Sequence, residues 1–422
     1  MFKNTIISEF FTTINFSVYL ETVWFLSYKL PFIRYWNSTL ELENELLSYI
    51  WNTDSKIISF YNARSAIYHV LKIIGVKESD EIIVSWYNCV SVSNAVIQSW
   101  AKIVYSDINE TNLWLDIASL EKNISKNTKA IIVQHTFWKP AFIKEIVLLA
   151  KEKNILVIED CAHSLWSILD WKMLWSFGDF SIFSTGRDKV ISWVTGGFLI
   201  INNKAYFDKI ELVKSLQIMP SRTLTLQNLL YNISAYKSYK VYDFFSIWKI
   251  IIYLSRKGKF ITEILSQNEK KCNFRDFNYK LPNSLAFLAK KQLQKIDEIT
   301  HHRIKLSDYY DKELNNEYFK PLFTKMINEE NNYFRYPILV KTVELKEELY
   351  NYMKNNNVLL WSTWSKTNIV PFWTNIDDAK YITWTCSVAE NISKRILTLP
   401  NHTLITLENA DKIIKLLNNF KK

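Results

Sequence analysis

Glycine is scarce in this chain, and the scarcity limits how the backbone can turn. The 422 residues include six glycines, whereas an average usage of roughly 7% would give about 30. Glycine takes a positive φ without steric cost, so a large protein with so few glycines must place other residues in its tight turns. The chain also contains sixteen tryptophans, and these are the candidates for such positions.

Several tryptophans occupy positions where a turn usually has glycine. Trp171 follows an aspartate, in the place of the glycine of an Asp-Gly hairpin. Trp100 ends a helix-forming stretch where a glycine commonly stops a helix. Some genetic codes read UGA as glycine, and a translation that reads this codon as tryptophan would produce the pattern. We predict that most of these tryptophans are misread glycine codons, with a true Trp-rich core as the alternative. Trp138, Trp166, Trp171 and Trp175 are then expected at turns, strand ends or a ligand cleft, with φ and ψ unfavourable for a bulky residue.

The composition is that of a soluble globular protein, with 48% hydrophobic and 22% charged residues. The four cysteines lie far apart, which favours neither a zinc site nor a disulfide framework and predicts a reducing cytoplasm. The net charge of +10 is spread along the chain and suits anionic small molecules, nucleic acid or an anionic membrane surface alike. Glu21 and Lys29 interrupt the apolar N-terminal stretch, so we expect neither a signal peptide nor a membrane span there.

Apolar, β-branched runs alternate with stretches of helical periodicity in the first half of the chain. Such alternation predicts βαβ units, hence an α/β fold with a mainly parallel central sheet and helices on both faces. The predicted strands are 81–85, 102–108, 129–136, 155–160, 180–184 and 197–202, and 141–153 is a predicted helix.

From about residue 285 the pattern changes to a smaller α+β domain. We expect a long helix at 283–314, a strand at 333–340, a helix at 344–356, a strand near 358–362 and a closing helix near 406–419. The predicted organisation is an N-terminal segment (1–50), a large domain (51–204), a helical insertion (205–275) and a small C-terminal domain (276–422).

The insertion is aromatic and basic, and charges interrupt it too often for a membrane span. Its mixed apolar and cationic character would suit an interfacial helix or a substrate lid. A helical subdomain packed on a dimer partner is an equal alternative.

Two residues carry the candidate chemistry. Asp160 ends the predicted strand "VIED", and Lys189 lies in a loop behind the strand at 180–184. Ligands of open α/β sheets gather at the carboxyl ends of strands. There a buried aspartate can keep a pyridinium nitrogen protonated, and a lysine can form a Schiff base with a pyridoxal aldehyde. Spacing alone leaves open that Asp160 is a strand-end cap and Lys189 a solvated loop charge.

The sequence resembles the DegT/DnrJ/StrS-type sugar aminotransferases, pyridoxal-phosphate enzymes of the aspartate-aminotransferase superfamily (fold type I). The resemblance covers roughly 50–204 and 278–420, and it includes "EIIVSWYNCVSVSNAVIQSWAKIVYSDI", "VIEDCAHSLWSILDWKMLWSFGDFSIFSTGRDK" and "CSVAENISKRILTLPNH". With glycine in place of Trp100, Trp138, Trp166, Trp171 and Trp175, these segments read as ordinary family sequence.

The resemblance implies roles for individual residues. Lys189 matches the lysine that bonds to the cofactor, Asp160 the partner of the pyridine nitrogen, and His163 the residue beside the ring hydroxyl. The remaining matches concern the phosphate and the ring face. Ser184, Arg64 and Ser65 correspond to phosphate-binding positions, Cys89 stands where the family often has a stacking aromatic residue, and Asn278 matches an asparagine that reaches the phosphate from the other subunit.

The implied function is transfer of an amino group from glutamate or glutamine to a nucleotide-linked keto sugar, in polysaccharide or amino-sugar biosynthesis. The implied protein is a cytoplasmic homodimer with pyridoxal 5'-phosphate, no metal and no nucleic-acid partner, and peripheral contact with the inner membrane surface through 205–270 is left open. The alternatives are a non-catalytic, cofactor-bound regulatory or membrane-associated relative, and an amino-acid aminotransferase on the same fold.

Overall fold

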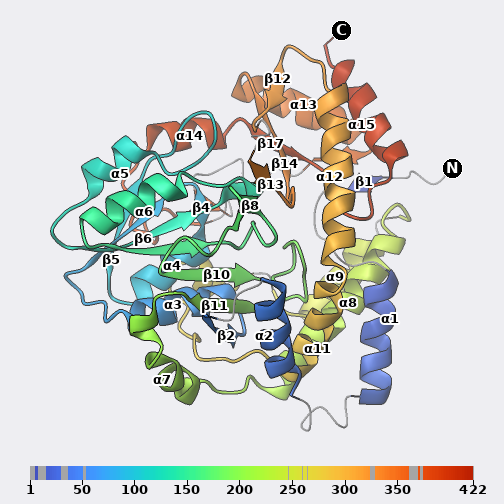
Figure 1. The fold of residues 1–422 in the computed structure, drawn as a ribbon. Coiled ribbons are helices and arrows are strands. Elements are labelled where there is room, and N and C mark those ends of the chain that lie inside the picture. The colour runs from blue at the N-terminus through green and yellow to red at the C-terminus, as the bar shows by residue number, and fades with distance from the viewer. Residues whose placement is uncertain are drawn as a thin grey trace.

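The computed structural model has a seven-stranded sheet at its centre (Figure 1). The strand order is β2-β11-β10-β7-β6-β3-β5, and β11 runs antiparallel to both its neighbours while the other pairs are parallel. The structure describes residues 5–7, 16–29, 37–50, 54–245, 247–258, 260–263, 265–323, 328–360, 369–370 and 374–421.

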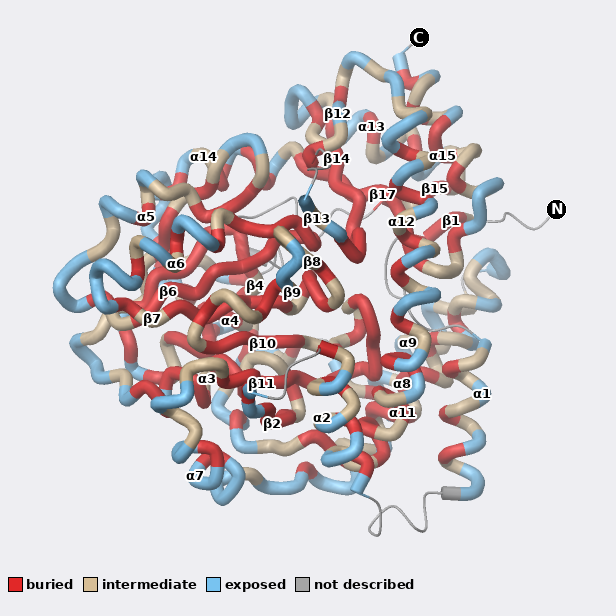
Figure 2. Tube along the Cα trace, viewed as in Figure 1, coloured by how far each residue is buried: buried red, intermediate tan, exposed pale blue. Residues whose placement is uncertain are grey.

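The strands of this sheet confirm the predicted ones and add β2. Their bounds are β2 Lys56–Phe60, β3 Glu81–Ser85, β5 Lys102–Ser106, β6 Thr128–Gln134, β7 Leu156–Asp160, β10 Phe180–Ser184 and β11 Gly197–Ile201. Figure 2 shows these strands as the buried interior of the large domain. The predicted α/β class with a mainly parallel sheet is therefore confirmed.

Both faces of the sheet are covered by helices, which explains why its strands are continuously apolar. In β3, Ile82 and Val84 point into one hydrophobic cluster, and Ile83 points into another on the opposite face. The first cluster includes α3 (Ala63–Ile73) and α4 (Val90–Gln98). The second includes α5 (Ile117–Asn123) and α6 (Ile143–Glu152), and α6 is the helix predicted at 141–153.

The C-terminal part builds a second core around the antiparallel sheet β12-β14-β17. Its strands are β12 Phe319–Pro321, β14 Tyr336–Val340 and β17 Ile396–Leu399, and its helices are α12 Ile296–Glu313, α13 Val343–Asn355 and α15 Leu407–Asn418. The N-terminal β1 (Ile6–Ile7) pairs with β15 (Val358–Leu359) at this core. Part of the strand predicted near 358–362 falls on residues 361–362, outside the described residues.

The single long helix predicted at 283–314 is wrong, because the structure divides it. α11 (Asn283–Leu293) ends before Gln294 and Lys295, and α12 begins at Ile296. α11 packs against α2 (Ser38–Tyr49) and the core of the large sheet, whereas Leu306 and Tyr310 of α12 enter the second core. Because of this break, α11 contributes to the core of the large sheet and α12 contributes to the second core.

The insertion contains α7 (Lys209–Leu216), α8 (Arg222–Lys240), α9 (Ile247–Lys257) and α10 (Gln267–Lys270). α8 packs against α9 and against α1 (Phe16–Trp24), which continues into a π-helical turn at Phe25–Lys29 (Figure 1). Within the described residues, no helix combines the length and apolar character needed to cross a membrane.

The tryptophans predicted to replace glycine do lie in turns with unfavourable backbone angles. The φ angles of Trp138, Trp166, Trp171 and Trp175 are 123°, 77°, 63° and 102°. Such values are rare for residues with a Cβ. Trp100, with a φ of 74°, also matches the prediction.

Candidate active site

Asp160 is the last residue of β7, at the carboxyl edge of the sheet. One carboxylate oxygen accepts a hydrogen bond from the Ala162 N–H at 3.0 Å. Burial raises the pKa of the Asp160 carboxyl, and the Ala162 bond and the positive charge of Lys189 act in the opposite direction. The aspartate is thus a buried acid with a cation close by, as the predicted chemistry requires.

Lys189 lies on the loop that joins β10 to β11. The loop folds back on itself, because the Thr185 N–H bonds to Gly196 O at 3.0 Å and the Trp193 N–H bonds to Thr185 O at 3.0 Å. Gly196 has a φ of 129°, and a Cβ there would lie 2.1 Å from Thr185 Oγ1, so this position needs glycine. The loop brings the Lys189 amine within 5.5 Å of the Phe334 ring centroid.

His163 completes the group formed by Asp160 and Lys189. Its Nδ1 accepts the Phe137 N–H at 3.2 Å, so the proton of the neutral ring resides on Nε2. The ring stacks on Phe334 with a centroid distance of 4.5 Å. Burial lowers the pKa of His163 well below its usual value, and the charges of Lys189 and Arg335 add to the shift. His163 is therefore a neutral imidazole at physiological pH.

The sequence analysis missed two charged residues that face this group. The Arg335 guanidinium lies 3.3 Å from an Asp188 carboxylate oxygen. Burial alone would raise the pKa of Asp188, but Lys189 and Arg335 hold it below the usual value. Arg335 belongs to the segment before β14 and comes from the C-terminal part of the chain. Its approach to Lys189 depends on how the two cores pack, which spacing in the sequence does not reveal.

The predicted phosphate region is the first turn of α3. Asn62 caps this helix, because its side chain accepts the Ser65 N–H at 2.9 Å and the Ser65 hydroxyl at 3.0 Å. A Cβ at Gly197 would lie 2.3 Å from the Ala63 nitrogen, so β11 approaches this turn as closely as glycine permits. The Arg64 guanidinium pairs with Glu269 and lies 5.4 Å from the Phe274 ring centroid. The phosphate roles of Arg64 and Ser65 stay predictions.

The remaining predicted site residues are Ser184, Cys89 and Asn278. Ser184 ends β10, five residues before Lys189, and its hydroxyl accepts the Gly186 N–H at 3.3 Å. Cys89 ends β4 (Asn88–Cys89) and precedes α4, with its Sγ 3.4 Å from the Ser91 hydroxyl. Asn278 is exposed, and its side chain bonds to His69 of α3, while the next residue, Tyr279, accepts the Tyr61 N–H at 2.8 Å just before the α3 N-cap.

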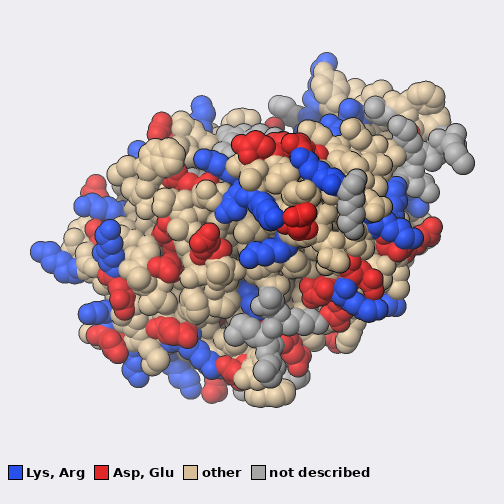
Figure 3. All heavy atoms as spheres, turned by 90° about the horizontal axis from the view of Figure 1, so that it is seen from above, with Lys and Arg blue, Asp and Glu red and all other residues tan. Residues whose placement is uncertain are grey.

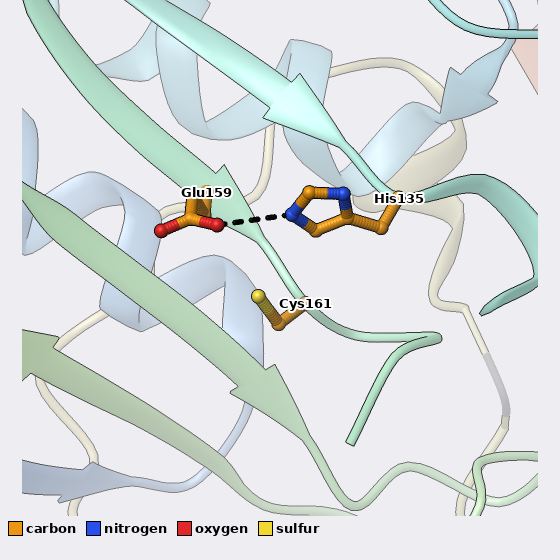
Figure 4. Close-up of side chains that lie close together, drawn as sticks. All are labelled: His135, Glu159 and Cys161. Carbon is orange, nitrogen blue, oxygen red and sulfur yellow. Dashed lines mark hydrogen bonds and ion pairs between the residues drawn. The ribbon is translucent and has the colours of Figure 1, made fainter. Parts of the chain in front are cut away.

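A buried cluster of His135, Glu159 and Cys161 lies where β6 and β7 end (Figure 4), and Glu159 and Cys161 are the chain neighbours of Asp160. Their ligand-type atoms are within 4.8 Å of one another. His135 Nδ1 accepts the Ala141 N–H at 3.1 Å, so Nε2 is left to donate to Glu159 at 3.1 Å. Burial raises the pKa of the Cys161 thiol well above its usual value, which keeps it protonated.

Glu159 also accepts backbone N–H groups from the segment before β10. The bonds come from Trp175, Phe177 and Gly178 at 3.1, 2.8 and 2.7 Å. A carboxylate with four donors and a histidine with both nitrogens engaged form a structural network rather than a metal site. The network fixes the strand that carries Asp160.

These residues define the kind of site. A buried carboxylate, a neutral imidazole and a lysine amine meet where β6, β7 and β10 end, at the carboxyl edge of a mainly parallel sheet. This fold is shared with solved aminotransferases. Helicobacter pylori PseC, an aminotransferase, aligns with a TM-score of 0.72 at 19% identity over 99% of this chain and 98% of that one. The PLP form of Spr1654 from Streptococcus pneumoniae aligns with a TM-score of 0.71 at 19% identity, covering 99% and 96%.

The chain belongs to the DegT/DnrJ/EryC1/StrS aminotransferase family, whose model matches residues 31–237 and 246–418. Among its relatives, the GDP-perosamine synthase of Escherichia coli O157:H7 is 23% identical, with 85% of this chain and 84% of the relative covered. A UDP-4-amino-4,6-dideoxy-N-acetyl-beta-L-altrosamine transaminase of Campylobacter jejuni is 25% identical, with 90% of each covered. The predicted family, fold and enzyme class are confirmed.

Proposed function

We propose that the protein transfers an amino group from glutamate or glutamine to a keto group of a nucleotide-linked sugar, with pyridoxal 5'-phosphate as cofactor. The observation that carries the proposal is that the half-buried Lys189 lies near the buried Asp160 and His163, close enough for its charge to act on both. The named relatives act on GDP- and UDP-linked sugars, which supports this substrate class. A nucleotide diphosphate also suits a chain with a net charge of +10.

The chemistry of Lys189, Asp160 and His163 supports this cofactor, whereas Arg64 would exchange its pairing with Glu269 for the phosphate. Lys189 would hold its aldehyde carbon, Asp160 its ring nitrogen and His163 its ring hydroxyl, while Ser184, Ser65 and Arg64 would receive its phosphate. When bound, the cofactor supplies an electron sink for a carbanion formed at the amino donor. Asp160 makes that sink effective, because its carboxylate stabilises a proton on the ring nitrogen. Cys89 would lie against the ring.

Lys189 is the proton-transfer residue in this proposal. With the cofactor bound, its free amine would be the base that takes a proton from the Cα of the amino donor, holds it and returns it. The Asp188–Arg335 pair positions the start of the lysine loop, since Asp188 precedes Lys189 and is held 3.3 Å from Arg335. His163 stays neutral and donates from Nε2, because its Nδ1 is occupied by the Phe137 N–H.

Absorbance spectroscopy tests the proposal and separates its alternatives. The purified protein with added cofactor is expected to show an absorbance band near the edge of the visible range, and glutamate or glutamine is expected to bleach it. A nucleotide-linked keto sugar is then expected to restore the band. Restoration by 2-keto acids but by no keto sugar would indicate an amino-acid aminotransferase. A band that no amino donor changes would indicate a non-catalytic relative and contradict the proposal.

The proposed active unit is a cytoplasmic homodimer in which Asn278 reaches the phosphate of its partner's site. Its exposed position supports this arrangement. We expect Asn278→Ala to weaken cofactor binding about tenfold or more, since a hydrogen bond to an anion is lost.

Mixed dimers test the role of Asn278 across the subunit boundary. A Lys189→Ala chain paired with an Asn278→Ala chain forms one site with both wild-type residues if Asn278 acts on the partner. Activity of the mixture is then expected to exceed that of either variant alone. Activity no higher than that of the separate variants would contradict this arrangement.

We also propose that α9 contacts an anionic membrane surface. Ile250, Tyr253 and Leu254 are exposed on one face of this helix at helical spacing, and Phe245 just before it is 86% exposed. Basic residues accompany them: Lys249, Arg256 and Lys257. An apolar stripe beside cations complements an interface of anionic lipid headgroups.

Vesicle flotation tests this contact. Wild-type protein is expected to bind vesicles of anionic lipid and not those of neutral lipid, and Ile250→Glu with Leu254→Glu is expected to weaken binding about tenfold or more. Leu148→Glu changes an equally exposed leucine on α6 and serves as the control. Equal binding by both variants, or a loss of dimers in the α9 variant, would contradict membrane contact.

A further inference from the structure

We infer that positions 100, 138, 166, 171, 175 and 384 are glycines in the protein as its own cells make it. Each carries tryptophan in the written sequence, and the φ angles of these six residues range from 63° to 123°. A Cβ makes this region costly for an L-residue, and a large aromatic side chain offers no local hydrogen bond in return. Each position also has a turn geometry of its own that asks for glycine.

Position 171 lies in a two-residue hairpin. Leu169 of β8 (Ile168–Leu169) pairs with Lys172 of β9 (Lys172–Met173), which leaves Asp170 and Trp171 as the connection. Both have positive φ, 47° and 63°. This is the type I′ turn, in which Asp-Gly is among the preferred pairs. The indole is 89% exposed, so no packing compensates for the strain.

Positions 138, 166 and 175 lie in short hydrogen-bonded turns. Each is the third residue of a turn closed by a backbone hydrogen bond: Lys139 N–H to Thr136 O, Ser167 N–H to Ser164 O and Ser176 N–H to Met173 O, at 3.2, 2.9 and 3.3 Å. In the turns at 166 and 175 the third residue alone has a positive φ, as type II turns require, and glycine is the usual residue there. In the turn at 138 the second residue, Phe137, also has a positive φ of 59°, as in type I′ turns, which again favour glycine. A φ of 123° at Trp138 lies beyond the left-handed region that asparagine tolerates.

Positions 100 and 384 are exposed. Helix α4 ends at Gln98 with Ser99 as its C-cap, so Trp100, with a φ of 74°, holds the next position, where glycine commonly ends a helix. Trp384 has a φ of 73° in the turn before α14 (Ser387–Ser393). Both indoles extend into solvent, with exposures of 70% and 74%.

Tryptophans with ordinary helical backbone differ from these six. Trp24 lies in α1 with its ring 6.2 Å from that of Phe287, and Trp248 lies in α9 with its ring 4.8 Å from that of Tyr242. The inference therefore covers only the tryptophans whose φ is positive.

Two of the six positions shape the candidate active site. The turn that contains Trp138 directs the Phe137 N–H to His163, and the N–H of Trp175 itself bonds to Glu159 behind Asp160. Glycine at 138 and 175 would hold these same bonds without backbone strain. The inference does not depend on the proposed reaction, because the φ angles alone carry it.

Peptide mass spectrometry of the protein enriched from cells that carry the gene tests the inference directly. The tryptic peptides 130–144, 154–172 and 173–187 contain positions 138, 166, 171 and 175. We expect glycine at all four, and asparagine unchanged at 154, where φ is 56° but the side chain tolerates it. Tryptophan at these positions would overturn the inference.

Recombinant variants isolate the effect of the backbone. Trp100→Ala with Trp171→Ala removes both exposed indoles but keeps each Cβ, and Trp100→Gly with Trp171→Gly removes the Cβ as well. The glycine pair is expected to melt higher than the alanine pair by roughly 1–2 °C per position. An alanine pair that melts as high as the glycine pair or higher would contradict the claim that these turns require glycine.

Discussion

Lys189→Ala is expected to lower kcat for amino transfer by about 10³-fold or more and to remove the visible-edge band of the cofactor. The substitution removes both the amine that would hold the cofactor and the base that moves the proton. Lys189→Arg is expected to be equally inactive, because a guanidinium keeps the positive charge beside Asp160 but does not lose its proton. Steady-state kinetics and absorbance spectra measure both effects.

The matched control for Lys189 is Lys172→Ala, in the exposed hairpin of β8 and β9. It is expected to leave the spectrum and kcat unchanged. A Lys189→Ala protein that keeps the band and transaminates at the wild-type rate would show that another group performs this chemistry.

Asp160→Asn is expected to lower kcat by on the order of 10²–10⁴-fold, because the amide no longer stabilises a proton on the ring nitrogen. The variant should nevertheless unfold at the same temperature or higher. Burial raises the pKa of Asp160, so its ionised form costs stability at neutral pH. An asparagine oxygen can still accept the Ala162 N–H.

The raised pKa of Asp160 also predicts how cofactor binding to the wild-type protein depends on pH. The working form of Asp160 is the carboxylate, and its pKa in the protein without cofactor is raised above the usual 3.8, so cofactor binding should weaken on acidification at a higher pH than for an ordinary aspartate. Asp54→Asn, at an exposed site, is the control and should alter neither activity nor melting. An Asp160→Asn variant that keeps the wild-type kcat and loses the cofactor at the same acidic pH as the wild type would contradict the role assigned to the Asp160 carboxylate.

The sheet could be predicted because both of its faces are covered, which makes its strands continuously apolar. β2 was missed, since "KIISF" begins with an exposed lysine and follows a helix without a preceding βα alternation. The division between α11 and α12 has no glycine or proline to mark it, and it arises because the two helices pack into different cores. Periodicity within one segment carries no information about such a division.

Family resemblance assigned Lys189 and Asp160 to one site, and the topology explains why the two residues lie near each other. β10 pairs directly with β7, so the loop after β10 begins beside the end of β7. Arg335 could not be found in this way, because it approaches from the C-terminal core. Asn62, by contrast, stands just before a helix and three residues ahead of Ser65, a capping signal readable in the sequence.

The most direct measurement is borohydride reduction of the cofactor-loaded protein followed by peptide mapping, which fixes the cofactor permanently to the amine that holds it. The account predicts a phosphopyridoxyl group on Lys189, with none on Lys172 and none on any lysine of the Asp160→Asn variant other than Lys189. A label on a different lysine, or a protein that binds the cofactor without forming any reducible bond, would contradict it.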